Sequence, residues 1–237
     1  MKKERIMIDD IPTIIWGEKS SKIFIAMHGN MSNKEDEVIQ IFADIVVSLG
    51  YQLLSFDLPE HGDMKEDHAY LCNAQNCIAD LEKVYEYVLK SYDDISIWAC
   101  SMSAYFSLIG LRDKKIKQAI FLSPVIDMFD LIKKMMSWAN VSKEKLQEKK
   151  VIYTSFGTVL YWDYYSFVEN NAVNKWDVET TIICGDEDDM QDHTSLLNFV
   201  DKYNCNLYTL EKGEHFFHTK PQLYYYKKCL REIFLYV

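Results

Sequence analysis

Apolar and polar positions along the chain form two kinds of block that alternate. The first kind is a short run of mostly apolar residues, which is typical of a strand buried within a sheet. The second kind is a longer segment with an apolar residue every three or four positions, which predicts an amphipathic helix. Strands are predicted over residues 22–27, 51–56, 95–100, 118–122, 180–184 and 206–210. Helices are predicted over residues 38–49, 73–91, 105–111, 192–200 and 219–233.

Capping signals precede three of these helices. Ser32 and Glu35 have the spacing of a capping box and are expected to begin the first helix. Thr219 and Gln222 have the same spacing before the closing helix, and Asp192 is expected to cap the helix before it. Strong start signals of this kind support the assignment of these segments as helices.

Strands that alternate with helices predict an α/β fold, in which a mostly parallel central sheet carries helices on both faces. Two short β-like pieces at residues 5–8 and 13–16 come first and are expected to form a hairpin at one edge of the sheet. No linker or repeat divides the chain, so residues 1–237 are expected to form a single domain. Ligands of such sheets bind at the carboxyl ends of the strands.

The alternation breaks down between the fourth and fifth predicted strands. Residues 125–176 are rich in aromatic side chains, and an insertion after a strand end would lie above the sheet. One interpretation is a small lid whose Trp138 and Trp162 line a substrate pocket. The other is a helical subdomain whose aromatic residues only pack on each other. The first predicts that replacing Trp162 changes the preferred length of the substrate more than stability, and the second predicts the reverse.

Composition limits the function classes. The 237 residues are 49% apolar, and their net charge of −10 argues against a nucleic-acid backbone or an anionic membrane as the main partner. The six cysteines have no CxxC spacing and are expected to be reduced. No signal peptide or membrane-spanning run is predicted, so a cytoplasmic location is expected.

The candidate nucleophile lies where the third predicted strand meets the next helix. Ser101 has small residues two positions away on each side, Ala99 and Ser103. This arrangement is related to the G-x-S-x-G turn, which exposes a serine at the end of a strand, although both glycines are replaced. Cys100 precedes the serine and is expected to pack without taking part in catalysis.

A serine, an acid and a histidine therefore follow strands in that order along the chain, and the sequence resembles the α/β-hydrolase superfamily, in particular small serine esterases and lipases with an inserted lid. The resemblance extends over essentially the whole chain. The segments that carry it are His28-Gly29-Asn30, Asp57-Leu58-Pro59-Glu60-His61-Gly62, the serine turn, Gly185-Asp186-Glu187-Asp188 and Gly213-Glu214-His215-Phe216.

The resemblance implies roles for these residues. Ser101 would be the nucleophile, His215 the base and Asp188 the acid, while the backbone N–H groups of Asn30 and Met102 would form the oxyanion hole. His28 resembles the structural histidine beside the oxyanion loop and is also a candidate for the substrate pocket. His61 is expected near the pocket mouth.

Alternatives remain for the acid and the base. Asp186 and Asp189 lie next to the expected acid, and His218 lies three residues from the expected base. The acidic cluster lacks the ligand spacing of a calcium loop, and the two histidines lack a third zinc ligand, so no metal and no cofactor are expected.

These residues predict a serine hydrolase that cleaves a small or medium carboxylic ester through an acyl-enzyme. A thioesterase or amidase with the same triad is an alternative, and so is a binding or regulatory protein that retains the fold without turnover. The expected partner is a small-molecule ester, without nucleic acid or membrane, and the oligomeric state is left open.

Overall fold

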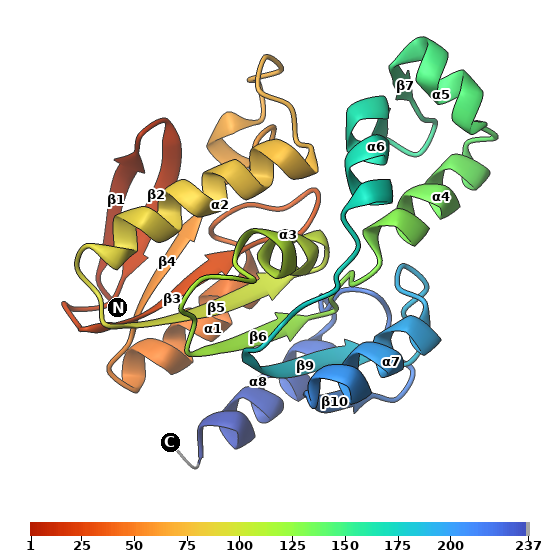
Figure 1. Cartoon of the computed structure of the whole chain (residues 1–237). Coiled ribbons are helices and arrows are strands. Elements are labelled where there is room, and N and C mark those ends of the chain that lie inside the picture. The colour runs from red at the N-terminus through yellow and green to blue at the C-terminus, as the bar shows by residue number, and fades with distance from the viewer. Residues whose placement is uncertain (236–237) are drawn as a thin grey trace.

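The computed structural model describes residues 1–235, and its main sheet contains eight strands (Figure 1). The strands run in the spatial order β1-β2-β4-β3-β5-β6-β9-β10. Their bounds are β1 Lys3–Ile8, β2 Ile11–Trp16, β3 Lys22–Met27, β4 Gln52–Phe56, β5 Asp94–Cys100, β6 Gln118–Leu122, β9 Glu179–Gly185 and β10 Asn206–Leu210. Each predicted strand is found within two residues of its expected bounds.

Strand pairing confirms a mostly parallel sheet. The β1-β2 hairpin is antiparallel and joins the sheet through an antiparallel pair between β2 and β4. Every other neighbouring pair is parallel. Because parallel strands end at the same edge, the loops that follow β3, β4, β5, β9 and β10 approach one another there.

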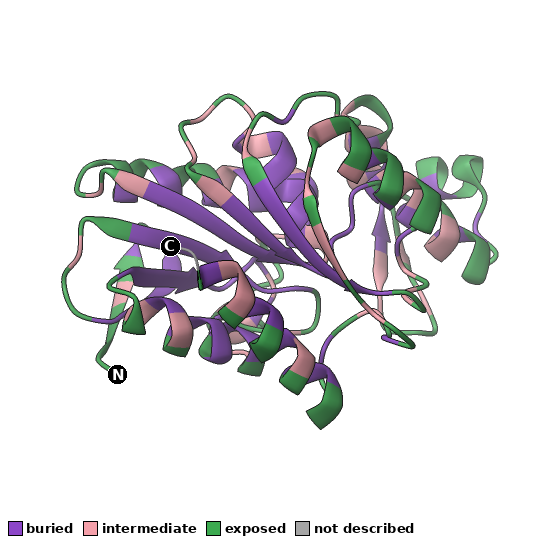
Figure 2. Ribbon diagram, turned by 90° about the horizontal axis from the view of Figure 1, so that it is seen from below, coloured by how far each residue is buried: buried purple, intermediate pink, exposed green. Residues whose placement is uncertain are grey.

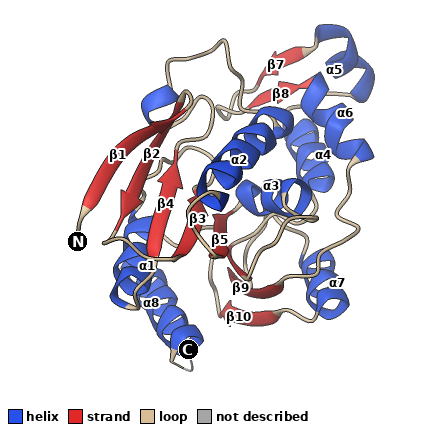
Figure 3. Ribbon diagram, turned by 60° about the vertical axis from the view of Figure 1, so that its left-hand side comes forward, coloured by secondary structure: helices blue, strands red, loops and turns tan. Residues whose placement is uncertain are grey.

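Helices cover both faces of the sheet (Figures 1 and 3). On one face lie α2 (Ala74–Leu89), α3 (Met102–Gly110) and α7 (His193–Tyr203), and on the other lie α1 (Glu37–Ser48) and α8 (Lys220–Phe234). The fold class predicted from the sequence is therefore confirmed. Among residues 1–235, no helix is both long and apolar enough to cross a bilayer.

The two helical layers bury the central strands almost completely (Figure 2), whereas the edge strands β1 and β10 remain partly exposed. On the α1 and α8 face, Phe42 stacks on Trp98 with ring centroids 5.7 Å apart, and both side chains have no exposed surface. Burying an aromatic or large aliphatic side chain contributes about 1.5–3 kcal/mol relative to leaving it exposed. The sheet is thus a rigid support for the loops at its edge.

The capping predictions had different outcomes. Thr219 and Gln222 form the predicted capping box, and Asp192 caps α7. The prediction for Ser32 and Glu35 is wrong, because α1 begins at Glu37 and its N-cap is Asp36. The Asp36 carboxylate accepts the hydrogen bond from a backbone N–H of the first turn, and Ser32 donates its hydroxyl to that same carboxylate.

A small helical group lies between β6 and β9. It contains α4 (Met128–Trp138), α5 (Lys143–Lys149), the antiparallel pair of β7 (Val151–Tyr153) and β8 (Val159–Tyr161), and α6 (Trp162–Asn170). Figure 1 shows this group beyond the carboxyl ends of β5 and β6, where α6 packs against α2 and α4. We call residues 125–176, which contain this group, the insertion.

Candidate active site

Ser101 forms the sharp turn between β5 and α3. Its backbone has φ 55° and ψ −123°, and a left-handed φ costs a non-glycine residue on the order of 1–3 kcal/mol. Two hydrogen bonds of 3.0 Å hold the turn, because Ser101 N–H donates to Leu122 O and Val125 N–H donates to Ser101 O. The adjacent strand β6 and the loop that follows it thereby fix the strained turn at the carboxyl edge of the sheet.

Small side chains around the turn explain how the two missing glycines are tolerated. Ala99 and Ser103 are completely buried, and the Ser103 hydroxyl donates a 2.5 Å hydrogen bond to His28 O. The loop after β3 faces the serine turn and carries a glycine, Gly29, at the point of closest approach. A Cβ on Gly29 would lie 3.2 Å from Ser101 Cβ. The close approach of the two loops therefore depends on Gly29.

Ser101, His215 and Asp188 form a continuous hydrogen-bonded series. The Ser101 Oγ lies 2.8 Å from His215 Nε2. The His215 Nδ1 lies 2.8 and 2.9 Å from the two carboxylate oxygens of Asp188. A carboxylate can only accept, so Nδ1 carries the proton, and Nε2 is left with a lone pair that accepts the serine O–H.

Two glycines bring the loops after β9 and β10 together. A Cβ on Gly185 would lie only 2.0 Å from Gly213 O, so any side chain at position 185 would push the loops apart. The Asp186 carboxylate accepts a 2.6 Å hydrogen bond from Lys212 N–H. Asp186 thus ties the loops together, while Asp188 faces the histidine.

The other candidates for the acid and the base are not part of the hydrogen-bonded series that starts at Ser101. Asp189 is exposed. His218 is also largely exposed, and its Nδ1 donates to Phe216 O at 2.9 Å. The ring packs on the Phe216 ring with centroids 4.2 Å apart. The histidine that contacts Ser101 is His215.

Asn30 and Met102 lie beside Ser101, and all three line one cavity. Met102 is the first residue of α3, where backbone N–H groups have no acceptor within the helix. Asn30 follows Gly29, the residue that contacts the serine turn. Both backbone segments therefore lie next to the Ser101 turn.

His28 holds the loop after β3 in place through two hydrogen bonds. Its Nε2 accepts from Leu58 N–H at 3.1 Å, and its Nδ1 donates to Gly29 O at 2.7 Å. Burial lowers the pKa of His28 to about 4, so the ring is neutral near pH 7. Although a substrate-pocket role was predicted for His28, its ring is buried and lines neither cavity beside Ser101.

The lowered pKa of His28 predicts that acid destabilises the protein. Between pH 6.5 and about 4 the unfolded chain binds a proton at His28 that the folded protein does not bind. The contribution of His28 to the free energy of unfolding is therefore complete above pH 6.5 and is lost as pH falls toward 4. We expect a contribution of about 2–3 kcal/mol. Urea unfolding at pH 7 and pH 4.5 should show a smaller loss for His28→Gln than for wild type. His68→Gln is the control, because His68 is exposed, and an unchanged pH dependence in His28→Gln would contradict the expectation.

His61 and Lys34 tie the loop after β3 to the loop after β4. The His61 Nδ1 donates to Pro59 O at 2.8 Å, and its Nε2 accepts from Met31 N–H at 3.1 Å. The buried Lys34 ammonium donates to the carboxylate of Asp57, which is fully buried. His61 lines the cavity at Ser101, as predicted.

Two cavities meet at Ser101. The first has a volume of about 350 Å³ and lies between the serine and the insertion. Its apolar wall consists of Met102, Met128, Leu131, Ile132, Met135, Val159, Leu160 and Met190, with Tyr161 and Tyr164. The second, of about 610 Å³, lies on the histidine side and is lined by residues that include Asp36, Val38, His215 and Phe217. An extended substrate can therefore place one part on each side of the serine.

Trp138 and Trp162, which were predicted to line a substrate pocket, do not line either of these two cavities. Trp138 is 53% exposed and packs edge-on against Phe156. Trp162 stacks on Tyr165 with ring centroids 5.5 Å apart. The indoles stabilise the insertion, whereas aliphatic and methionine residues of α4 form its cavity wall. These residues form the apolar face of the amphipathic helix α4. Their helical spacing in the sequence could have indicated this face, but the prediction was based on the aromatic composition of the insertion.

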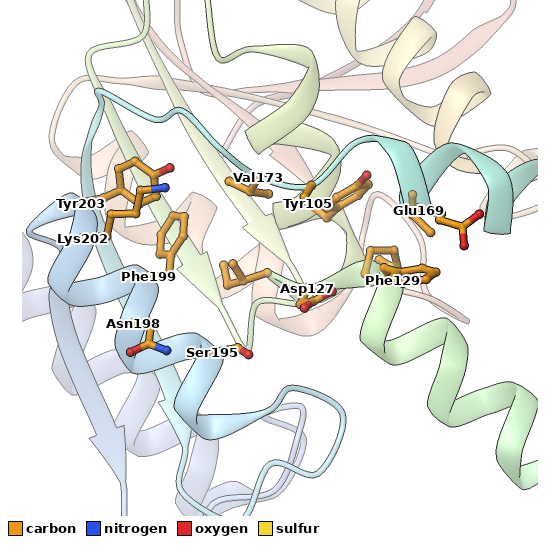
Figure 4. A pocket seen from close by; sticks show the side chains of 14 residues that line it. Tyr105, Asp127, Phe129, Glu169, Val173, Ser195, Asn198, Phe199, Lys202 and Tyr203 are labelled. Carbon is orange, nitrogen blue, oxygen red and sulfur yellow. The ribbon is translucent and has the colours of Figure 1, made fainter.

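A third cavity of about 320 Å³ lies apart from Ser101, between α7 and the insertion (Figure 4). Phe199, Phe129 and Val173 line its apolar side, and Asp127 and Lys202 lie at its border. It shares Met128 with the first cavity. Cavities therefore lie at two places where the insertion meets the rest of the protein.

Several solved structures are similar to this one, although no protein-family model and no curated protein sequence matches the chain. Est1E from Butyrivibrio proteoclasticus, with ferulic acid bound, has a TM-score of 0.76 and 19% identity over 98% of both chains. Alpha/beta hydrolase domain-containing protein 10 from mouse has a TM-score of 0.76 and 12% identity over 98% of both chains. The esterase Pf2001 from Pyrococcus furiosus has a TM-score of 0.72 and 18% identity, covering 99% of this chain and 90% of its own. The protein therefore has the α/β-hydrolase fold.

Proposed function

We propose that the protein is a serine hydrolase that cleaves carboxylic esters through an acyl-enzyme. The observation that carries the proposal is the hydrogen-bonded series from Ser101 Oγ through the His215 ring to the Asp188 carboxylate. A serine hydroxyl becomes nucleophilic when a base takes its proton, and a neutral imidazole with a free Nε2 lone pair can do so. The esterase named among the similar structures supports the same class of reaction.

The first half of the reaction forms the acyl-enzyme. Ser101 Oγ attacks the ester carbonyl carbon while its proton moves to His215 Nε2. The resulting imidazolium is stabilised by the Asp188 carboxylate, which also holds the proton on Nδ1. His215 then donates the Nε2 proton to the leaving alcohol as the carbon–oxygen bond breaks.

The second half returns the enzyme to its starting state. His215 takes a proton from water, the hydroxide attacks the acyl carbon, and the proton passes back to Ser101 as the acid leaves. Negative charge develops on the substrate oxygen in both halves, and the backbone N–H groups of Asn30 and Met102 are proposed to receive it. Removing one such donor typically costs about 3–4 kcal/mol of transition-state stabilisation.

The insertion is proposed to act as a lid that shapes the acyl pocket. The 350 Å³ cavity has a mainly apolar wall that includes several flexible methionines, and methionine adapts to ligands of different shape. The Butyrivibrio protein holds ferulic acid, so aromatic acyl groups belong in the substrate series beside aliphatic ones. Small and medium acyl groups match a cavity of this volume.

Narrowing the proposed acyl pocket should shorten the preferred substrate. We expect Met135→Trp to reduce kcat/KM at least about tenfold for p-nitrophenyl octanoate, because the indole takes space that a longer chain needs, while the acetate is hydrolysed nearly normally. Trp138→Ala is the matched control, since Trp138 is on the same helix but outside the cavity. A chain-length profile that shifts equally in both variants would contradict the assignment of this pocket.

The proposal is tested by covalent labelling together with turnover. The folded protein should hydrolyse p-nitrophenyl esters and should gain one phosphonyl group, on Ser101, from a fluorophosphonate. Labelling of Ser101 without ester turnover would direct the search to thioesters and amides, which the same chemistry serves. Absence of both labelling and turnover in folded protein would overturn the proposal and favour a non-catalytic binding protein.

A further inference from the structure

Cys72 and Cys77 form a thiol pair beside the cavity at Ser101. Their Sγ atoms lie 3.7 Å apart. Cys72 lies in the loop just before Asn73, the N-cap of α2, while Cys77 is within the first turns of that helix and completely buried. The spacing is that of a hydrophobic staple, in which the residue before an N-cap packs on the helix. Packing alone would explain the contact if both thiols were inaccessible.

Cys72, however, is accessible from the cavity. Its side chain is only partly buried and belongs to the lining of the 350 Å³ cavity. Its N–H donates to the Glu60 carboxylate at 2.8 Å, which fixes the loop next to the helix. A small solute that enters the cavity therefore reaches Cys72 first, with Cys77 directly behind it.

The surroundings of the pair favour a thiolate on Cys72. A hydrogen bond from Cys77 outweighs burial, and the nearby His61 ring adds to it against the opposing charge of Glu60, so that the pKa of Cys72 is lowered to about 6. Burial raises the pKa of Cys77, and the neighbouring Cys72 raises it further, so Cys77 retains its proton. Cys72 lies two residues from the start of α2, where the helix dipole also favours a negative charge.

The other four cysteines have the opposite environment. Burial raises the pKa of Cys184 and Cys205 to about 11 and also raises the pKa of Cys100 and Cys229. All six cysteines are free. A thiol is attacked by oxidants and alkylating agents as its thiolate, so reactivity near neutral pH should be concentrated on one of the six.

We propose that Cys72 and Cys77 form an oxidant-sensitive modification site, in which Cys72 reacts with a hydroperoxide and Cys77 resolves the product as a disulfide. The Cys72 thiolate attacks one oxygen of hydrogen peroxide, so that an S–O bond forms, the O–O bond breaks and the leaving hydroxide is protonated to water. Cys77 then attacks the Cys72 sulfur, the S–O bond breaks, and the departing hydroxide combines with the Cys77 proton. Two thiols lose two hydrogens in total, and one peroxide is reduced to two waters.

The geometry suits this second step. The sulfur separation must shorten from 3.7 Å to about 2.05 Å. Residues 57–73 between β4 and α2 contain only the short 3₁₀ turn η1 (Gly62–Met64). Cys72 therefore moves within a loop, while α2 holds Cys77 in place.

The test uses the intact protein and does not depend on ester turnover, so its outcome is separate from that of the proposed function. Folded protein is treated with a small excess of hydrogen peroxide, denatured, alkylated and digested with trypsin. Cys72 and Cys77 are contained in one tryptic peptide, residues 66–83. We expect this peptide to be lighter than the reduced form by two hydrogen atoms and unalkylated, and dithiothreitol should restore alkylation.

Matched variants separate the two roles. Cys77→Ser should accumulate a Cys72 sulfenic acid that dimedone traps, and Cys72→Ser should abolish both the disulfide and the trapped adduct. Cys205→Ser is the control, because Cys205 is also partly buried but has a raised pKa, and its peptide 66–83 should oxidise as in wild type. Circular dichroism checks that each variant is folded.

Alkylation of the reduced wild type provides a measurement without any variant. Because the thiolate is present above the pKa, iodoacetamide should label Cys72 at nearly full rate at pH 7, and the rate should fall as pH decreases through about 6. At pH 7 the labelling of Cys72 should exceed that of Cys205 at least about tenfold. Equal labelling of the two, or a folded wild type whose peptide 66–83 stays dithiol under peroxide, would overturn the proposal and leave the pair as a packing contact.

Discussion

Replacing Ser101 with alanine is expected to abolish ester hydrolysis while leaving the protein folded. Removing the nucleophile of a serine triad typically lowers kcat by roughly 10⁴-fold or more. The substitution retains Cβ, so the packing against Gly29 and the left-handed turn with φ 55° are unchanged. The free energy of unfolding should therefore differ little from that of wild type. Initial rates on p-nitrophenyl acetate and butyrate, with circular dichroism of both proteins, provide the measurement.

A matched serine substitution distinguishes the nucleophile from a general effect on the protein. Ser48 is exposed near the end of α1, and its hydroxyl bonds only to Ile45 O in its own helix. Ser48→Ala should hydrolyse esters at the wild-type rate. Substantial turnover in folded Ser101→Ala would mean that another residue attacks the ester, or that the observed activity comes from a contaminant.

Replacing Asp57 with alanine is expected to cause a large loss of stability. The Asp57 carboxylate is fully buried, and it accepts from the Lys34 ammonium and from the N–H groups of Lys34 and Asp63, each of these two at 2.9 Å. Burial acts to lower the pKa of Lys34, but its hydrogen bonds with Asp57 and Asp63 outweigh burial and raise it. Breaking a buried pair by removing one partner typically costs about 3–5 kcal/mol. That is a large fraction of the roughly 5–15 kcal/mol by which a domain is stable.

Urea unfolding of three variants tests this assignment. Asp10→Ala is the surface control and should change the free energy of unfolding by less than about 0.5 kcal/mol, since Asp10 is exposed in a turn. The double variant Asp57→Ala with Lys34→Met should be more stable than Asp57→Ala alone, because it also removes the buried ammonium, which would otherwise keep only the exposed Asp63 as a carboxylate partner. If Asp57→Ala unfolds at the same urea concentration as Asp10→Ala, the pair does not hold these loops together.

Much of the fold followed from local pattern. Strands such as β3 and β6 have the predicted bounds, since nearly continuous apolar runs between turns leave few alternatives to a buried strand. The N-cap of α1 was misassigned because two side chains able to cap a helix, Ser32 and Asp36, lie within five residues of each other. Asp36 accepts both the backbone N–H and the Ser32 hydroxyl, a choice that depends on the path of the preceding loop.

The sequence by itself determined the strand and helix alternation, and with it the edge of the sheet at which Ser101, the acidic loop and His215 lie. The reason is that a parallel sheet with right-handed crossovers places the carboxyl ends of its strands together. Only the tertiary structure decided that Asp188 contacts the histidine while Asp186 ties two loops together. Their separation in sequence is two residues, and the difference arises from how two distant loops pack.

The cavity wall and the thiol pair were likewise decided by tertiary contacts. The aromatic composition of the insertion favoured Trp138 and Trp162, but their rings pack against other parts of the insertion, and the inner face of α4 lines the cavity. The environment that distinguishes Cys72 is formed by Cys77 together with His61 from another part of the loop. The sequence shows which residues are apolar or chemically reactive. The neighbours that change the reactivity of a side chain come from separate segments, and they are determined only when these segments pack together.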